Sequence, residues 1–140
     1  MDKNLLERSL ALVDLPDDGL TVRFYEVLFA RYPEVQPMFS RGMRPQAAML
    51  RTAIIAVIDH LEDPQWLEST LGTLGRRHAE LGVTGPMYGA VAECMIAAMS
   101  EIGGPRWTPE MTAAWTEALT AVASLMMAAY PDEEGTSGAA

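Results

Sequence analysis

Apolar residues recur at steps of three and four along most of the chain, a spacing that places side chains on one face of an α-helix. The clearest stripe lies in the segment 64–82 and consists of Leu67, Leu71, Leu74, His78 and Leu81. His78 is the polar member of this stripe, so we expect its imidazole to point inward with the leucines. No segment alternates apolar and polar residues between hairpin turns, and we therefore predict an all-α fold.

Prolines, glycines and capping residues divide the chain into six or seven predicted helices. The expected helices cover 3–14, about 16–32, about 44–61, 64–82, 85–102 and a segment from 108 onward, with one short helical turn at 33–39. Asp63 before Pro64 and Thr108 before Pro109 are typical of helix starts, because a capping side chain then precedes a proline at the first helical position. Pro16 likewise suits the start of the second helix, and the two aspartates after it suit the positive end of a helix dipole.

The length and composition indicate one globular domain, because the chain has 140 residues, of which 49% are hydrophobic. Cys94 is the only cysteine, so an internal disulfide is excluded and a reducing compartment is favoured. The N-terminal segment contains no apolar run long enough for a signal peptide or a membrane span. We therefore expect a cytoplasmic protein that does not enter a membrane, with a disordered tail at 131–140.

The formal net charge of −9 argues against nucleic acid as a partner. The basic residues nevertheless gather in the middle third of the chain. They are Arg41, Arg44, Arg51, Arg76 and Arg77. Two interpretations remain open, since these arginines can neutralise an acidic ligand or can simply be exposed on helix surfaces.

The chain lacks CxxC, HExxH, a glycine-rich phosphate loop and GxSxG, which removes the zinc, nucleotide and serine-hydrolase interpretations. The polar residues expected on inward faces are Tyr25, Gln46, His78 and Tyr88. A lone histidine cannot build a zinc site, but it can be the single axial ligand of a haem iron. Tyr25 and Gln46, on two different helices, would then be the hydrogen-bond donors on the opposite wall. His60 lies near the end of its helix and is expected at the surface.

Each of these residues also has an ordinary structural explanation. His78 can be a core histidine that is hydrogen-bonded to a carbonyl, and Tyr25 can lie at the edge of the core. Gln46 can belong to a frayed first turn, and Phe39 can be a core anchor. Methionines and leucines at helical spacing are more often core residues than cofactor contacts. Only the order and spacing of all these residues together favour a cofactor site.

Two stretches taken together resemble the bacterial single-domain globins and the haem domain of flavohaemoglobins. They are FYEVLFARYPEVQPMF at 24–39 and LGRRHAELGVTGPMY at 74–88, and the similarity extends over roughly residues 5–130. The resemblance implies a globin domain at 1–130 with the globin fold. It also implies haem b, iron protoporphyrin IX, held between the helix that bears Gln46 and the helix that bears His78.

By this resemblance His78 would be the proximal iron ligand and Tyr25 and Gln46 the distal donors. Leu50 would be an apolar distal gate, and Phe39 would stack on the porphyrin. The further cofactor contacts implied are Met43, Leu74, Arg77, Val83, Tyr88 and Val91. The haem propionates would pair with Arg44, Arg51 or Arg77, and the sequence does not choose between them.

The sequence departs from the flavohaemoglobin pattern in two ways. Where those proteins carry a glutamate late in the last helix, which supports the proximal histidine together with the tyrosine corresponding to Tyr88, this chain has Tyr130. The missing carboxylate argues against a strongly basic, peroxidase-like proximal histidine. Flavohaemoglobins also continue into flavin and nicotinamide domains, so we expect any sustained turnover here to need a separate reductase.

The leading functional hypothesis is a haem protein for oxygen transport or storage that reversibly binds dioxygen and other diatomic ligands, nitric oxide and carbon monoxide among them. An enzymatic alternative is nitric oxide dioxygenase activity with electrons from a separate reductase. A third hypothesis is a globin-fold sensor module that works without haem, in which His78 is structural.

Overall fold

The computed structural model describes residues 1–131, which form six α-helices and two short 3-10 helices. The α-helices are α1 (Lys3–Val13), α2 (Gly19–Arg31), α3 (Met43–Asp59), α4 (Pro64–Glu80), α5 (Gly85–Gly103) and α6 (Pro109–Met127), and the 3-10 helices are η1 (Pro33–Met38) and η2 (Gly104–Arg106). No strand occurs in this range, so the predicted all-α fold is confirmed. The disorder expected at 131–140 concerns residues that, apart from Pro131, lie outside the described part.

Two helix starts follow the predicted capping chemistry. The Asp63 carboxylate accepts a hydrogen bond from the Trp66 backbone N–H at 3.2 Å, with Pro64 at the first helical position of α4. The Thr108 hydroxyl accepts from the Met111 N–H at 3.2 Å at the start of α6. These side chains satisfy backbone donors that have no partner inside the helix.

The start of α2 differs from the prediction. Asp17 and Asp18 both have φ of +58°, and the helix begins only at Gly19. Pro16 therefore lies in the turn before the helix, where its carbonyl accepts from the Gly19 N–H at 3.2 Å. A Cβ at position 19 would lie 2.8 Å from Leu15 Cβ, so this tight turn requires glycine.

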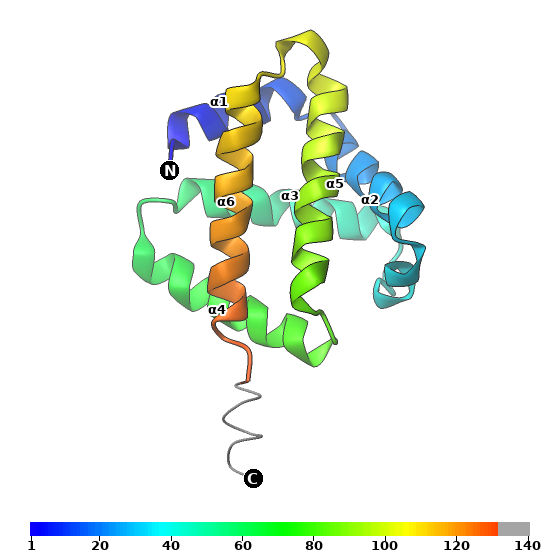
Figure 1. The fold of residues 1–140 in the computed structure, drawn as a ribbon, viewed down its shortest axis with the longest axis vertical. Helices are drawn as coiled ribbons and strands as arrows, with labels where there is room; N and C mark the ends of the chain where they lie inside the picture. Colours follow the sequence, from blue (N-terminus) through cyan, green and yellow to red (C-terminus); the bar gives the residue numbers. More distant parts are fainter. Residues whose placement is uncertain (132–140) are drawn as a thin grey trace.

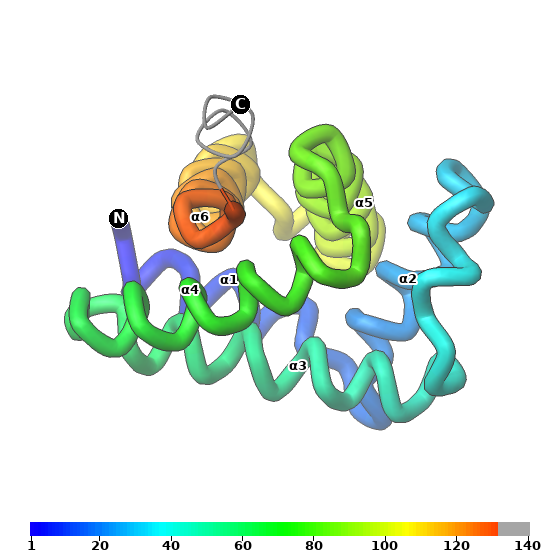
Figure 2. The backbone as a smooth tube through the Cα atoms, turned by 90° about the horizontal axis from the view of Figure 1, so that it is seen from below, coloured from blue at the N-terminus to red at the C-terminus, as the bar shows by residue number. Residues whose placement is uncertain are grey.

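The helices are stacked in layers that cross one another. Figure 1 shows α5 and α6 side by side along the long axis, with α3 and α4 crossing them. Figure 2, seen from below, shows α4 between α3 and the α5/α6 pair. Among the contacts, α4 packs on α6, and α2 packs on both α5 and α3. The C-terminal end of α4, which carries His78, is thereby placed close to the start of α5 and the end of α6.

Buried hydrogen bonds join these layers. The Trp115 indole N–H donates to the hydroxyl of the fully buried Ser9 at 2.7 Å, which connects α6 to α1. The hydroxyl of Thr21 donates to the Ala47 carbonyl at 2.9 Å, which connects α2 to α3. Because unpaired buried polar groups are costly, these pairings restrict how the helices can shift against each other.

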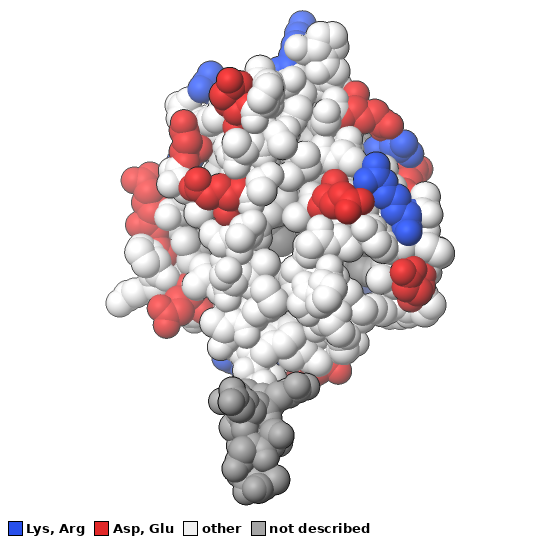
Figure 3. Space-filling model, in the orientation of Figure 1, with Lys and Arg blue, Asp and Glu red and all other residues white. Residues whose placement is uncertain are grey.

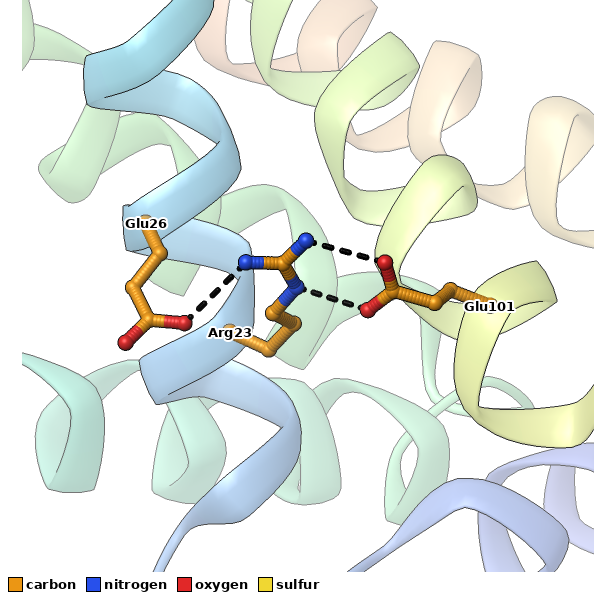
Figure 4. A network of polar contacts seen from close by, with 3 residues as sticks. All are labelled: Arg23, Glu26 and Glu101. Carbon is orange, nitrogen blue, oxygen red and sulfur yellow. Dashed lines mark hydrogen bonds and ion pairs between the residues drawn. The ribbon is translucent and has the colours of Figure 1, made fainter.

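An exposed ion-pair network connects α2 to α5 (Figure 4). The Arg23 guanidinium donates two hydrogen bonds to Glu101, at 2.6 and 2.9 Å, and a third to Glu26 at 3.2 Å. Further along the same pair of helices, Arg31 donates to Glu93 at 2.9 Å. Exposed pairs of this kind contribute little to stability individually.

The surface in the orientation of Figure 3 carries its charged side chains mainly toward the edges, and the area over α6 and the lower part of α5 is largely uncharged. Within residues 1–131, no single helix is long and apolar enough to cross a membrane. The segments Pro64–Glu80 and Gly85–Arg106 meet that length and hydropathy criterion only when taken together, and they are bent by 113°.

Candidate functional site

His78 lies in the last turn of α4, and only one of its two ring nitrogens is hydrogen-bonded. Its Nδ1 is 2.9 Å from the carbonyl oxygen of Leu74, one turn earlier. Because a carbonyl only accepts, Nδ1 carries the proton, and the lone pair is then on Nε2. Within the described residues Nε2 has no hydrogen-bond partner. The backbone of α4 thus fixes the tautomer that suits metal ligation.

Two cavities meet at this imidazole. One has a volume of about 350 Å³ and is bounded by η1, α3, α4 and α5, and the other has about 230 Å³ and extends between α3, α4 and α6. Both are lined by Leu74, His78, Val83, Met87 and Val91. The walls of both cavities are mostly apolar, so His78 is the main polar group at their junction.

Gln46 and Tyr25 form a hydrogen-bonded pair beside the larger cavity, although Tyr25 itself lines neither cavity. Gln46 lines the larger cavity, and its side-chain amide donates to the Tyr25 hydroxyl oxygen at 3.3 Å. Tyr25 is buried behind it, with 3% of its surface exposed. Burial raises the pKa of the Tyr25 hydroxyl, and the hydrogen bond from Gln46 lowers it by a smaller amount. The phenol therefore stays protonated at neutral pH, and its own O–H is free to donate.

Aromatic packing fixes the edge of the larger cavity. The ring centroid of Phe39 lies 5.4 Å from that of Tyr25, at 69°, and 5.5 Å from that of Phe29. Tyr25 and Phe29 are also 5.7 Å apart, so the three rings form one cluster. Edge-to-face arrangements of this kind are favourable for aromatic rings. The turn at η1 thus carries Phe39 inward, as predicted.

Most of the residues singled out from the sequence line one of the two cavities. They are Phe39, Gln46, Leu50, Leu74, Arg77, His78, Val83, Tyr88 and Val91. Leu50 and Tyr88 face the smaller cavity, whereas Phe39, Gln46 and Arg77 face the larger one. Met43 is 36% exposed at the start of α3 and lines neither cavity.

Two arginines lie at the solvent edge of the larger cavity. Arg41 and Arg77 both line it and are both exposed. Arg51 is instead paired with Asp14, at 2.8 Å for each of two hydrogen bonds, and Arg44 lines neither cavity. Arg41 was predicted only as a member of the arginine cluster and not as a partner of the propionates, although its place two residues after Phe39 was an available signal.

His60 provides a contrast with His78. It is half-buried, not fully exposed as expected, because its ring stacks on that of Trp66 at a centroid distance of 3.8 Å. Its Nδ1 is 2.8 Å from the Ala56 carbonyl oxygen. His60 lines neither cavity, so this second histidine has the same helical hydrogen bond as His78 without the cavity.

Tyr88 and Tyr130 occupy the other side of His78. The rings of His78 and Tyr88 are nearly parallel, at 24°, with centroids 6.2 Å apart. The hydroxyl oxygens of Tyr88 and Tyr130 are 2.8 Å apart, and Tyr130 donates to the Val83 carbonyl at 2.9 Å. Since Tyr130 uses its proton there, it accepts from Tyr88. Burial and the hydrogen bond to Tyr130 raise the pKa of Tyr88. The Tyr88 hydroxyl beside His78 therefore stays protonated and uncharged at neutral pH.

Comparison with known proteins shows the family of this chain. A model of the globin family matches residues 22–126, a range that includes Tyr25, Gln46 and His78. The chain belongs to the globin family. The globin fold packs its helices around a haem pocket, with a proximal histidine that holds the iron.

The similar proteins include two bacterial relatives. A globin-like protein of Aquifex aeolicus is 31% identical over 123 residues, which cover 88% of this chain and 87% of that protein. A flavohemoprotein of Rhizobium meliloti is 32% identical over 129 residues, which cover 89% of this globin but only 32% of the relative. This globin thus spans about a third of the flavohemoprotein's length.

A solved structure extends the comparison. An engineered carbene transferase from Rhodothermus marinus, derived from a protein described as a candidate nitric oxide dioxygenase, superposes with a TM-score of 0.78 at 26% identity. The superposition covers 98% of this globin and 93% of that chain.

The residues of this globin fit a haem group. One imidazole nitrogen is free to ligate, and it lies at the junction of two apolar cavities. Gln46 lines the larger cavity with the Tyr25 hydroxyl hydrogen-bonded behind it, and Arg41 and Arg77 lie at the solvent edge of that cavity. A single histidine ligand is sufficient because the macrocycle supplies four of the other positions.

Proposed function

We propose that this globin binds haem b through Nε2 of His78 and reversibly binds dioxygen and other diatomic ligands. The observation that carries the proposal is the position of His78, with its Nδ1 hydrogen-bonded to Leu74, at the junction of two apolar cavities, the larger of which Gln46 also lines. When bound, the haem supplies an iron atom with a coordination position open to a diatomic molecule.

The protein's own residues have separate tasks in this proposal. The hydrogen bond from Nδ1 to Leu74 orients the imidazole and holds its proton on Nδ1, which leaves Nε2 directed to the cavity junction. The apolar linings exclude water from the ligand side. Gln46 donates to the Tyr25 oxygen, which leaves the phenolic proton for a polar diatomic ligand.

The solvent edge of the larger cavity is suited to anionic groups. Arg41 and Arg77 line it from different segments, the link after η1 and α4, and their guanidinium groups can pair with two carboxylates. We assign the haem propionates to these two arginines. Arg51 is excluded from this role by its bidentate pairing with Asp14.

A second candidate function is nitric oxide dioxygenase activity. Its support is the similarity to flavohemoproteins and to the Rhodothermus marinus protein described as a candidate for that activity. In that reaction nitric oxide and dioxygen combine with one electron to give nitrate, and we propose a separate reductase as the source of that electron. Repeated turnover to nitrate with a partner reductase would support the activity, and a single stoichiometric burst would count against it.

We also place the protein in the cytoplasm, because its single cysteine, Cys94, is a buried free thiol. The haem-independent sensor module remains the contrasting hypothesis. It assigns His78 a purely structural role and predicts that added haem leaves the melting temperature unchanged, since only a ligand that binds the native state stabilises it.

The decisive experiment compares His78→Ala with His60→Ala, because these are the two histidines of the chain. After addition of haem, absorption spectra of the ferric, ferrous and carbon monoxide-treated states are recorded before and after gel filtration. We expect wild type and His60→Ala to keep a Soret band and His78→Ala to lose it. A wild-type protein that stays colourless would contradict the proposal.

A further inference from the structure

In the link between α4 and α5, both backbone polar groups of Val83 are hydrogen-bonded. Its N–H donates to the carbonyl of His78 at 3.0 Å, and its C=O accepts from the Tyr130 hydroxyl at 2.9 Å. Gly82, with φ of +85°, makes the reversal that brings Val83 back onto the last turn of α4. Tyr130 is therefore connected to the backbone of His78 through one intervening residue.

A second connection runs through a side chain. The Tyr88 hydroxyl donates to the Tyr130 oxygen at 2.8 Å, and the Tyr88 ring lies nearly parallel to the imidazole of His78. This hydrogen bond fixes the position of the Tyr88 hydroxyl and so keeps the side chain beside the imidazole. Tyr130 is thus connected to His78 by two routes, through the backbone of the link and through the Tyr88 side chain beside the imidazole.

Tyr130 follows the end of α6, which packs closely against α4. A Cβ built on Gly75 would overlap the backbone carbonyl group of Met126, so α4 and α6 approach each other as closely as their backbones allow. One turn earlier, a Cβ on Gly72 would lie 3.9 Å from the Cβ of Ala129. The end of α6 is therefore packed closely against the α4 segment that leads to His78.

We propose that Tyr130 is a positioning residue for the iron ligand: its hydrogen bonds to Val83 and Tyr88 set the tilt of the His78 imidazole. The inference rests on the proposed haem function. It assigns to a neutral phenol a purely geometric role, in which the hydroxyl orders the proximal segment without adding charge to it. The Tyr130 hydroxyl makes no contact with the imidazole nitrogens, which distinguishes positioning from direct hydrogen bonding.

The test compares Tyr130→Phe with Tyr88→Phe and with a matched control, Tyr32→Phe. The Tyr32 hydroxyl donates to Glu93 at 3.0 Å on the surface, and Tyr32 lines neither cavity. The control thus removes a hydrogen-bonded hydroxyl away from the site. Two readouts are used: amide hydrogen exchange of Val83 in the haem-free protein, and the iron–histidine stretching band of the ferrous haem-loaded protein by resonance Raman spectroscopy.

For Tyr130→Phe we expect Val83 exchange to accelerate by roughly tenfold, the effect of one lost hydrogen bond on local opening, and the iron–histidine band to shift and broaden. Tyr88→Phe should leave Val83 exchange at the wild-type rate and shift the band less. Tyr32→Phe should alter neither readout. These three patterns separate the backbone connection from the ring connection.

An iron–histidine band that is unchanged in Tyr130→Phe would overturn the proposal, even if Val83 exchange accelerates. Tyr130 would then stabilise the link between α4 and α5 without affecting the imidazole. If Tyr130→Phe does not fold, an unchanged band in Tyr88→Phe overturns it instead. A wild-type protein that takes up no haem would contradict the proposed function itself, and this outcome is recognised before any variant is compared.

Discussion

The side-chain amide of Gln46 donates a hydrogen bond to the hydroxyl oxygen of Tyr25 across 3.3 Å. The direction of this bond matters, because the oxygen of Tyr25 accepts and its proton remains available. Gln46 itself lines the larger cavity while Tyr25 lies buried behind it. Under the proposed function the two residues form a relay, in which Gln46 orients the Tyr25 hydroxyl that would donate to a polar diatomic ligand.

We expect Tyr25→Phe to raise the dioxygen dissociation rate. A hydrogen bond to a partly charged acceptor is worth about 1.5–3 kcal/mol, which corresponds to roughly a 10- to 150-fold change in rate. Stopped-flow displacement of dioxygen by carbon monoxide measures the rate, with Tyr32→Phe as the control. A dissociation rate equal to that of wild type would show that the Tyr25 hydroxyl does not reach the ligand.

The relay also predicts that Tyr25→Phe and Gln46→Ala are coupled. If Gln46 acts by orienting Tyr25, its removal should matter less once the hydroxyl is gone, with a coupling free energy of about 0.5–3 kcal/mol. The same displacement experiment on both single variants and the double variant gives this value. Strictly additive effects would mean that the two residues act on the ligand independently.

For the arginines at the cavity edge, we expect Arg41→Ala and Arg77→Ala each to accelerate haem loss by roughly two- to fivefold, as is usual for exposed ion pairs. The effect should shrink at high salt. Arg76→Ala is the matched control, since Arg76 is exposed beside Arg77 but donates to Thr73 and lines neither cavity. Transfer of haem to an excess of apomyoglobin provides the rate. Equal rates in Arg76→Ala and Arg77→Ala would contradict the assignment.

The sequence was sufficient for the features that depend on local periodicity and capping. The position of His78 among leucines, and the helix starts at Asp63 and Thr108, follow from neighbours within one or two turns. The turn at Asp17 and Asp18 was mispredicted, because both aspartates adopt a left-handed conformation that helix-start rules do not anticipate.

The features that sequence reasoning missed depend on contacts between distant segments. The hydrogen bond from Tyr130 to Val83 joins residues 47 positions apart, and nothing local to either residue indicates it. Arg41 reaches the cavity only because η1 turns the chain toward α4. Similarly, Arg51 could not be separated from the other arginines until its pairing with Asp14 was known.

The ion pair between Asp14 and Arg51 predicts an acid-sensitive contribution to stability. The hydrogen bond from Arg51 lowers the pKa of Asp14, with burial opposing it to a smaller degree. A lowered pKa in the folded state gives stability that is present above about pH 4, the unfolded value, and is lost as the pH falls below it. A double-mutant cycle of Asp14→Asn and Arg51→Gln should give a coupling below about 1 kcal/mol at pH 6, because Arg51 is partly exposed. The coupling should vanish near pH 2, and a coupling that is independent of pH would contradict the assignment.

The close crossing of α4 and α6 predicts opposite effects for two glycine-to-alanine substitutions. At Gly75 an added Cβ would overlap the Met126 carbonyl group, so Gly75→Ala must push the helices apart, and we expect a loss of about 1–3 kcal/mol in the free energy of unfolding. At Gly89, on the exposed side of α5, nothing lies within 4 Å of the added Cβ, and Gly89→Ala should stabilise by about 0.5–1 kcal/mol. Urea unfolding of the haem-free protein measures both.

Because Gly75 lies one turn before His78, Gly75→Ala should also weaken haem retention, whereas Gly89→Ala should not. Stabilisation by Gly75→Ala would mean that the two backbones are farther apart than the structure places them.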